Sequence, residues 1–139
     1  LMSDLKTPRT EPAVLPYPTP PYESIAELTQ QYLGTVRRVG QGLLIHGTPS
    51  GESEILNAAG FEQLRRLVVP SGAVVVRTAE DIVAWVFSRS DMAPHLFGDR
   101  REEFERGLRA LLARAAPTGV FAEQLPDTEI RYTQRACFQ

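Results

Sequence analysis

The sequence of 139 residues contains one cysteine, Cys137, which excludes an internal disulfide and a zinc site built on several cysteines. A chain without disulfides is typical of a reducing compartment, so we expect a cytoplasmic protein. Long apolar runs are also missing, because stretches such as residues 73–76 fall far short of the roughly 20 residues that span a bilayer. The first residues lack the apolar segment of a secretory signal, and we expect no membrane partner.

Neither sign of charge dominates the chain. Fifteen basic and seventeen acidic residues give a net charge of −2. Arginine pairs occur at residues 37–38, 65–66 and 100–101, but none extends into a longer basic run. A protein that binds nucleic acid through its phosphates needs an extended basic surface, so we expect no nucleic-acid partner.

Several motifs of catalysis and metal binding are absent. The sequence contains no GxSxG elbow, no HExxH pair and no EF-hand loop, which leaves hydrolase and metal-site predictions without support. Glycines at positions 40, 42, 47 and 51 lack the GxGxxG or GK[ST] spacing of a phosphate loop. The glutamates at positions 102, 103 and 105 indicate a solvated helix face.

The length and the hydrophobic fraction of 42% fit one globular domain. Six of the eleven prolines lie in residues 1–22, and proline favours extended backbone, so this segment is predicted to be an extended arm. Its Val14, Leu15, Tyr17 and Tyr22 favour an arm that lies on another surface. Residues 23–139 are predicted to form a single α/β domain, which would be classed as α+β in the isolated chain.

Capping patterns predict where three helices begin. Ser24 with Glu27 matches a capping box, and the same logic applies to Thr78 with Asp81 and to Asp99 with Glu102. The first helix is expected to end at Gly34 and the last at Pro117 and Gly119. A further helix is expected from Thr48 and Pro49 to Gly60. The following apolar side chains would face inward: Ile25, Leu28 and Tyr32; Ile55, Leu56 and Ala59; Ile82, Val83, Val86 and Phe87, with Trp85 at the edge; and Phe104, Leu108, Leu111, Leu112 and Ala115.

Four segments are predicted to be strands. QLRRLVVP and AVVVR are β-branched runs separated by Ser71 and Gly72, and they would form either a hairpin or two successive strands. VFAEQ and TEIRYTQR follow the last helix. In the latter, Ile130 and Tyr132 alternate with polar residues, which is typical of a half-buried or edge strand.

The connector SRSDMAPHLFGD contains the residues that most resemble a site. Asp91 and Asp99 lie four residues on either side of His95, and a carboxylate near an imidazole can orient it and raise its pKa. The alternative is that both aspartates only cap helices. His46 lies in the glycine-rich segment, where a surface position is the alternative to a role in catalysis. Trp85 with Phe87 would either line an apolar pocket or belong to the core.

Several phrases of the sequence, taken in order, resemble a known family. YLGTVRRVGQG, GTPSGESEILNAAGF, VVVRTAEDIVAWVFSRSDMAPHLFGDRREEFERGLRALL and APTGVFAEQ are similar to the C-terminal part of bacterial class I S-adenosylmethionine-dependent methyltransferases that act on small molecules. The likeness covers about Tyr22 to Arg135. None of these phrases is itself a cofactor motif.

The resemblance implies a Rossmann-like sheet whose last strands are an antiparallel pair. FEQLRRLVV would be the first strand of this pair and TEIRYTQR the last, and an inserted helix pair between them would cover the acceptor substrate. Trp85, Arg89, Asp91 and His95 would face the substrate side.

The resemblance also implies what this chain lacks. The glycine-rich cofactor loop of the family's N-terminal half is absent, so we expect no bound S-adenosylmethionine and no methyl transfer by the chain alone. Its partner would then be a small-molecule acceptor or the missing N-terminal half.

Two alternatives remain open. The chain could be a stand-alone α+β interaction module, possibly a homodimer through its strand edges. It could also be a small-ligand sensor or carrier, with the ligand between the helix of residues 81–90 and that of residues 100–115.

Overall fold

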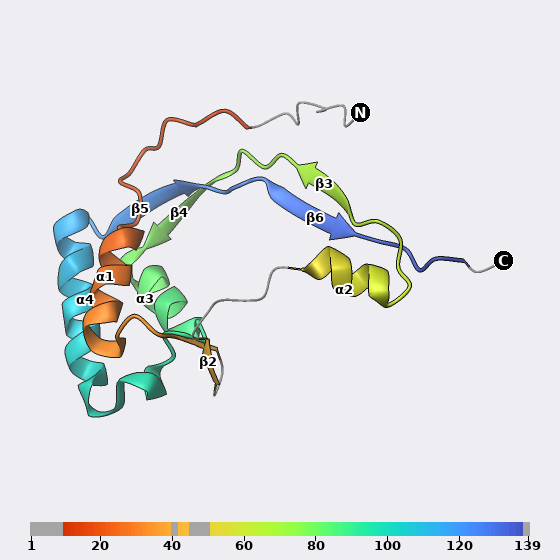
Figure 1. The fold of residues 1–139 in the computed structure, drawn as a ribbon. Helices are drawn as coiled ribbons and strands as arrows, with labels where there is room; N and C mark the ends of the chain where they lie inside the picture. The colour runs from red at the N-terminus through yellow and green to blue at the C-terminus, as the bar shows by residue number, and fades with distance from the viewer. Residues whose placement is uncertain (1–9, 40–41, 45–50, 138–139) are drawn as a thin grey trace. The chain divides into compact units, whose positions relative to one another are not determined.

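A computed structural model describes residues 10–39, 42–44 and 51–137, with only the backbone described for residues 37–39 and 42–44. The fold is α+β (Figure 1). Its elements are α1 (Tyr22–Leu33), β1 (Arg37–Val39), β2 (Gly42–Leu44), α2 (Glu52–Ala58), β3 (Arg65–Val69), β4 (Val74–Thr78), α3 (Ala79–Ser88), the 3-10 helix η1 (Pro94–Arg100), α4 (Arg101–Ala115), β5 (Val120–Gln124) and β6 (Thr128–Tyr132).

The chain divides into two compact units, which are described separately. The helical unit comprises residues 14–47 and 74–124. The ribbon unit comprises residues 1–13, 48–73 and 125–139. In the described part of the chain, no helix combines the length and the apolar character needed to cross a membrane.

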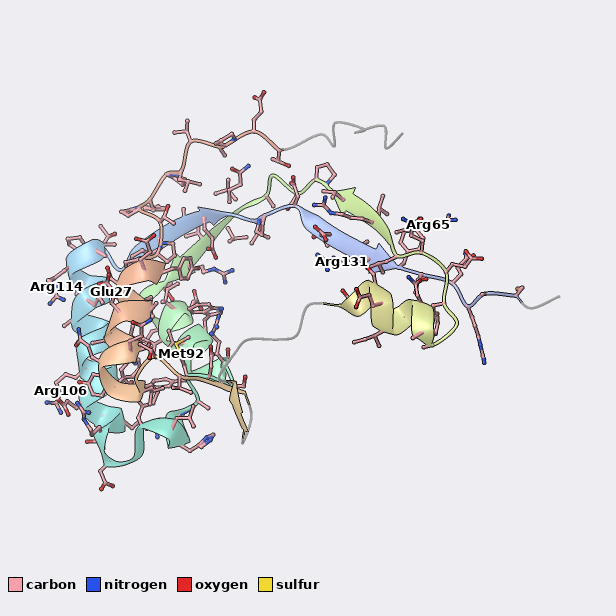
Figure 2. All side chains as sticks on the ribbon, viewed as in Figure 1. Glu27, Arg65, Met92, Arg106, Arg114 and Arg131 are labelled. Carbon is pink, nitrogen blue, oxygen red and sulfur yellow. The ribbon has the colours of Figure 1, made fainter. Side chains whose placement is uncertain are left out.

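The core of the helical unit lies where α1, α3 and α4 pack together (Figure 1). It contains the following side chains that are at most 1% exposed: Ile25, Ile82, Val86, Phe104, Leu108, Leu112 and Phe121. Each fully buried side chain of this size contributes about 1.5–3 kcal/mol through removal of apolar surface from water. Arg106 and Arg114 project from the outer side of α4 (Figure 2), and both are exposed. Of the three glutamates predicted to lie on a solvated face, Glu102 and Glu103 are exposed and Glu105 is half-buried.

The predicted start of α3 is confirmed. The Thr78 hydroxyl oxygen accepts a hydrogen bond from the Asp81 backbone N–H, and the Asp81 carboxylate accepts one from the Thr78 backbone N–H. The inward stripe of Ile82, Val83 and Val86 is also confirmed. Capping and periodicity agree here, which is why the sequence specifies this helix so clearly.

The predicted starts of α1 and α4 are wrong. Pro21 is the N-cap of α1 and Ser24 lies inside its first turn without a side-chain capping bond, because the chain becomes helical three residues earlier than predicted. Arg100 is the N-cap of α4, because η1 takes up Asp99 and continues to Arg100. The predicted end of α1 at Gly34 is confirmed, with a φ of 75° that favours glycine.

The strands form two-stranded antiparallel pairs. In the helical unit, β1 pairs with β2, and β4 pairs with β5 in the register Val76↔Ala122. In the ribbon unit, β3 pairs with β6 in the register Leu67↔Ile130. The strands β3 and β4 are therefore successive strands rather than a hairpin. The β1–β2 pair was not predicted, because three-residue strands in a glycine-rich segment show no alternating pattern.

The antiparallel pairing expected between FEQLRRLVV and TEIRYTQR is confirmed over β3 and β6, and Phe61 forms one further bridge with Arg135. All five residues of β6 are exposed, so this strand is an edge strand and the half-buried alternative is wrong. The helix α2 begins at Glu52 with Gly51 as its N-cap. The predicted cap residues Thr48 and Pro49 lie outside the described residues.

Candidate functional site

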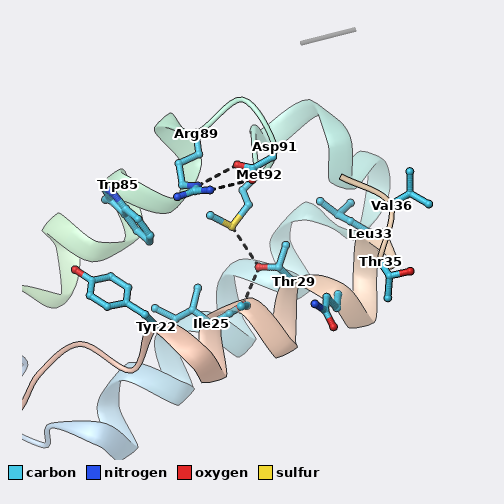
Figure 3. Close-up of a pocket in the computed structure, with 13 residues that line it drawn as sticks. Tyr22, Ile25, Thr29, Leu33, Thr35, Val36, Trp85, Arg89, Asp91 and Met92 are labelled. Carbon is cyan, nitrogen blue, oxygen red and sulfur yellow. Dashed lines mark hydrogen bonds and ion pairs between the residues drawn. The ribbon is translucent and has the colours of Figure 1, made fainter. Parts of the chain in front are cut away.

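The helical unit contains a pocket of about 520 Å³ between α1 and the C-terminal end of α3 (Figure 3). This α1–α3 pocket is lined by Tyr22, Ile25, Ala26, Thr29, Gln30, Leu33, Gly34, Thr35, Val36, Trp85, Arg89, Asp91 and Met92. Its volume falls in the range of about 300–1,000 Å³ that is common for small-molecule sites.

Two aromatic rings form one wall of the pocket. The rings of Tyr22 from α1 and Trp85 from α3 pack edge to face, with centroids 5.2 Å apart and an interplanar angle of 64°. This geometry is favourable for aromatic pairs because the positive edge of one ring meets the negative face of the other. Trp85 is half-buried, so the remainder of its ring is available to a ligand.

The hydroxyl of Tyr22 is held outside the pocket by a carboxylate. It donates a hydrogen bond of 2.7 Å to Oε2 of Glu123 on β5, and Arg77 on β4 donates from Nε to the other oxygen, Oε1. Burial, followed by this hydrogen bond to Glu123, raises the pKa of Tyr22 to about 12. Tyr22 therefore stays protonated at neutral pH. The hydrogen bond to Glu123 and the contact with the Trp85 ring hold its side chain in place.

An ion pair lies beside the aromatic wall, just after the C-terminal end of α3. Arg89 donates from Nε and Nη2 to the two oxygens of Asp91, at 3.0 and 2.9 Å, in the bidentate geometry that suits a guanidinium. The side chains are 38% and 20% exposed, so the pair is accessible from the pocket. The hydrogen bonds to Asp91 raise the pKa of Arg89 above its already high usual value. The Arg89 guanidinium carbon also lies 5.2 Å from the centre of the Trp85 ring.

Thr29 and Met92 lie opposite the aromatic wall (Figure 3). The Thr29 hydroxyl donates to the carbonyl of Ile25 at 2.8 Å and lies 3.4 Å from the sulfur of Met92. Met92 is 8% exposed and Ile25 is 1% exposed. This side of the pocket is therefore a packed, largely apolar surface.

Three of the four residues predicted to face a substrate line the pocket. These are Trp85, Arg89 and Asp91. His95 is exposed on η1 and is not among the lining residues. His46 lies outside the described residues.

The sequence-based prediction missed the contribution of α1. The proline pattern places Tyr22 in the predicted arm, and no catalytic or binding motif singles out Thr29 or Met92. A signal was present, because Tyr22, Ile25, Thr29 and Leu33 follow the spacing of one helix face. The sequence could not indicate that this face is opposite α3.

The predicted ligand position between α3 and α4 is wrong. Aromatic side chains fill this space: Phe97 stacks on Phe104 with centroids 4.0 Å apart, and Phe87 packs on Phe104 at 6.0 Å. The α1–α3 pocket lies toward α1 instead. Within residues 10–39, 42–44 and 51–137, no group of three or more histidine, cysteine, aspartate or glutamate residues could hold a metal ion.

No family model matches this chain, and no curated protein or solved structure shows significant similarity to it. Its function must therefore be inferred from the chemistry of the α1–α3 pocket and the resemblance of its sequence phrases.

Proposed function

We propose that this chain is the C-terminal, acceptor-binding portion of an S-adenosylmethionine-dependent methyltransferase that acts on a small molecule, and that it is not catalytic alone. One observation carries the proposal. Trp85, Arg89 and Asp91, which the family resemblance assigns to the substrate side, all line one pocket of small-molecule size.

The chemistry of the pocket suits an acceptor molecule. Apolar and aromatic walls would exclude water from the ligand, and a polar pair at one end would orient it. The aromatic wall comes from helices, because Trp85 lies on α3 and Tyr22 on α1, and the polar pair directly follows the end of α3. A site built on helices holds a reacting group more accurately than one built on loops.

The order of elements also supports the proposal. Antiparallel strands β3 and β6 flank, in the sequence, the helices α3 and α4. This is the order that the resemblance implies for the last strands of a Rossmann-like sheet with an inserted helix pair. The donor-binding strand and glycine-rich loop of that fold would belong to a partner or to another part of the protein.

Calorimetry of the folded chain with S-adenosylmethionine and S-adenosylhomocysteine tests the donor side of the proposal. We expect no tight binding of either compound. Tight binding of the methyl donor would contradict the division of roles proposed here.

A parallel screen of small phenols, amines and carboxylates tests the binding of a methyl acceptor. Trp85, the single tryptophan, serves as a fluorescent reporter in the pocket. A folded chain that binds none of them would contradict an acceptor-binding role.

A small-ligand sensor or carrier would use the same pocket without a methyl donor. The acceptor screen does not separate this role from the proposed one. Methylation of a bound molecule, after addition of a donor-binding partner and S-adenosylmethionine, would separate the two, because only the methyltransferase produces a methylated product.

An interaction module is the second candidate, and the β3–β6 pair favours it. Leu67 lies directly opposite Ile130, and Tyr132 shares their face. These three side chains are 51%, 42% and 44% exposed. An apolar face of this kind on a two-stranded sheet can pair with a second copy of the chain.

Light scattering tests this second candidate. A homodimer that forms through the apolar face should dissociate when Leu67→Glu places a charge there. The control Val14→Glu introduces the same charge at a side chain that is 98% exposed, and it should leave the dimer intact. A monomeric wild-type chain at high concentration would exclude the homodimer.

A further inference from the structure

The polar groups of the α1–α3 pocket are unevenly distributed. Its walls are the rings of Tyr22 and Trp85 and the apolar side chains of Ile25, Leu33 and Met92. The charged groups lie together at one end, as the Arg89–Asp91 pair. A ligand that fills the pocket therefore needs a long apolar part and a polar group at one end only.

The other polar side chains are already engaged or lie at the rim. The Tyr22 hydroxyl donates to Glu123, and the Thr29 hydroxyl donates to the Ile25 carbonyl. Gln30 and Thr35 are exposed. A hydroxyl has one proton to donate, so neither engaged hydroxyl can donate to a ligand without losing its present partner.

Arg89 still has donors to offer. A guanidinium carries five N–H groups, and the two hydrogen bonds to Asp91 use two of them. The Asp91 carboxylate neutralises the charge of Arg89. A carboxylate or phosphate on the ligand would compete with Asp91 and repel it, whereas a neutral oxygen can accept an N–H without disturbing the pair.

The aromatic wall favours a planar ring over a saturated one. Aromatic pairs in offset or edge-to-face packing gain about 0.5–1.5 kcal/mol beyond the burial of their area. A saturated ring of similar size gains only the free energy that comes from burying its apolar area. Met92 on the opposite side favours the same choice, because a thioether makes favourable contacts with aromatic rings.

We infer that the α1–α3 pocket binds an uncharged planar aromatic molecule with one oxygen that can accept a hydrogen bond, such as a phenol. The ring packs against Trp85 and Tyr22, and the oxygen accepts a hydrogen bond from Arg89. The inference rests on the proposed function in taking this molecule as the methyl acceptor, but its binding requires no donor.

Calorimetry with three matched probes tests the ligand class. Naphthol carries the planar ring and the neutral oxygen, naphthoate replaces the oxygen by a carboxylate, and decahydronaphthol replaces the planar ring by a saturated one. We expect naphthol to bind about tenfold or more tightly than either of the others. Equal or tighter binding of naphthoate would overturn the neutral-oxygen requirement. Equal binding of decahydronaphthol would overturn the aromatic requirement.

Substitutions of arginine test whether Arg89 donates the hydrogen bond to the ligand. Arg89→Met should weaken naphthol binding about tenfold and leave the binding of naphthalene, which has the same ring but no oxygen, almost unchanged, because only naphthol loses a hydrogen bond to a charged donor. The matched control is Arg109→Met on α4, where the arginine forms ion pairs with Glu80 and Glu105 and does not line the pocket. It should change neither affinity. Equal loss of naphthol and naphthalene binding in Arg89→Met would overturn the assignment of the hydrogen bond to Arg89.

A second variant guards against a purely structural effect. Arg89→Gln keeps an N–H₂ donor but removes the charge, and it should retain more naphthol affinity than Arg89→Met at a similar melting temperature. No difference between these variants would overturn the role of Arg89 as donor. Binding of the methyl donor S-adenosylmethionine is measured separately. Tight binding of S-adenosylmethionine would contradict the proposed function, while a preference for naphthol would still support the ligand class.

Discussion

The Tyr22 hydroxyl donates a hydrogen bond of 2.7 Å to Oε2 of Glu123, across a separation of 101 residues. The other oxygen of Glu123 accepts from Arg77. One carboxylate on β5 is therefore bound both to the first residue of α1 and to a residue of β4. Because the Tyr22 ring also packs on Trp85, this carboxylate fixes one wall of the α1–α3 pocket.

Replacing Tyr22 by phenylalanine should remove this connection and keep the ring. We expect Tyr22→Phe to lower the free energy of unfolding by about 1 kcal/mol, the usual net contribution of a hydrogen bond. Urea denaturation measures the change. Tyr17→Phe is the control, because Tyr17 is 42% exposed, and it should have little effect. Equal changes in the two variants would contradict the importance of the bond to Glu123.

The same hydroxyl should make stability depend on alkaline pH. The pKa of Tyr22 is raised from 10.0 to about 12 in the folded chain, so the folded state holds its proton more tightly than the unfolded state. Its contribution is fully present below pH 10 and is lost as the pH rises from 10 through about 12. The melting temperature of wild type should fall over this interval more steeply than that of Tyr22→Phe. Parallel curves would contradict the prediction.

Two segments with the same capping pattern show how far the sequence could predict the fold. Thr78 with Asp81 forms the expected box, whereas Ser24 with Glu27 does not cap a helix. The difference between the two segments lies in the residues that precede Ser24. The backbone N–H of Ile25 donates to the carbonyl of Pro21, so α1 already includes Ser24. Local patterns predicted that both helices exist but could not place the first turn of α1.

Substitution of the two candidate caps should therefore have different effects. Thr78→Ala removes an acceptor from the N-terminus of α3 and should cost about 1 kcal/mol of stability. Ser24→Ala lies within the first turn of α1 and should be neutral or slightly stabilising, because alanine has the higher helix propensity. Thermal unfolding of the pair compares them directly. A larger loss in Ser24→Ala would contradict the observed helix start.

Acidification should also reveal the cap of α3. The Thr78 backbone N–H, together with the Thr78 hydroxyl, lowers the pKa of Asp81. A carboxyl with a lowered pKa stabilises the fold above its ordinary pKa, and this contribution is lost as the pH falls through the lowered value. The stability difference between wild type and Asp81→Asn should therefore shrink at acidic pH. A constant difference would show that the charge of Asp81 plays no part.

The pocket depends on relationships that no local pattern contains. Trp85, Arg89 and Asp91 lie within seven positions of one another and could be grouped from the sequence. Tyr22 and Thr29 reach the same pocket only because Ile25 and Leu28 of α1 join the core formed by α3 and α4. Contacts of this kind depend on packing between distant elements. The same reason explains why the space between α3 and α4 was wrongly chosen as the ligand site.

Two glycines of the α3–α4 region should respond in opposite ways to alanine. Gly98 has a φ of 54° and a ψ of −131° at the kink inside η1, a conformation that disfavours a Cβ even where space is open. We expect Gly98→Ala to destabilise the helical unit by about 1–3 kcal/mol through backbone strain. Chemical denaturation measures the loss.

Gly107 provides the matched comparison, because it lies inside α4 with helical backbone. An added Cβ would lie 3.8 Å from Cδ1 and Cδ2 of Leu28, which is ordinary van der Waals contact. Gly107→Ala should therefore stabilise the helical unit by about 1 kcal/mol, since glycine is a poor residue for a helix interior. Destabilisation by this change would contradict the packing of α1 on α4, because it would mean that Leu28 leaves no room for a methyl group.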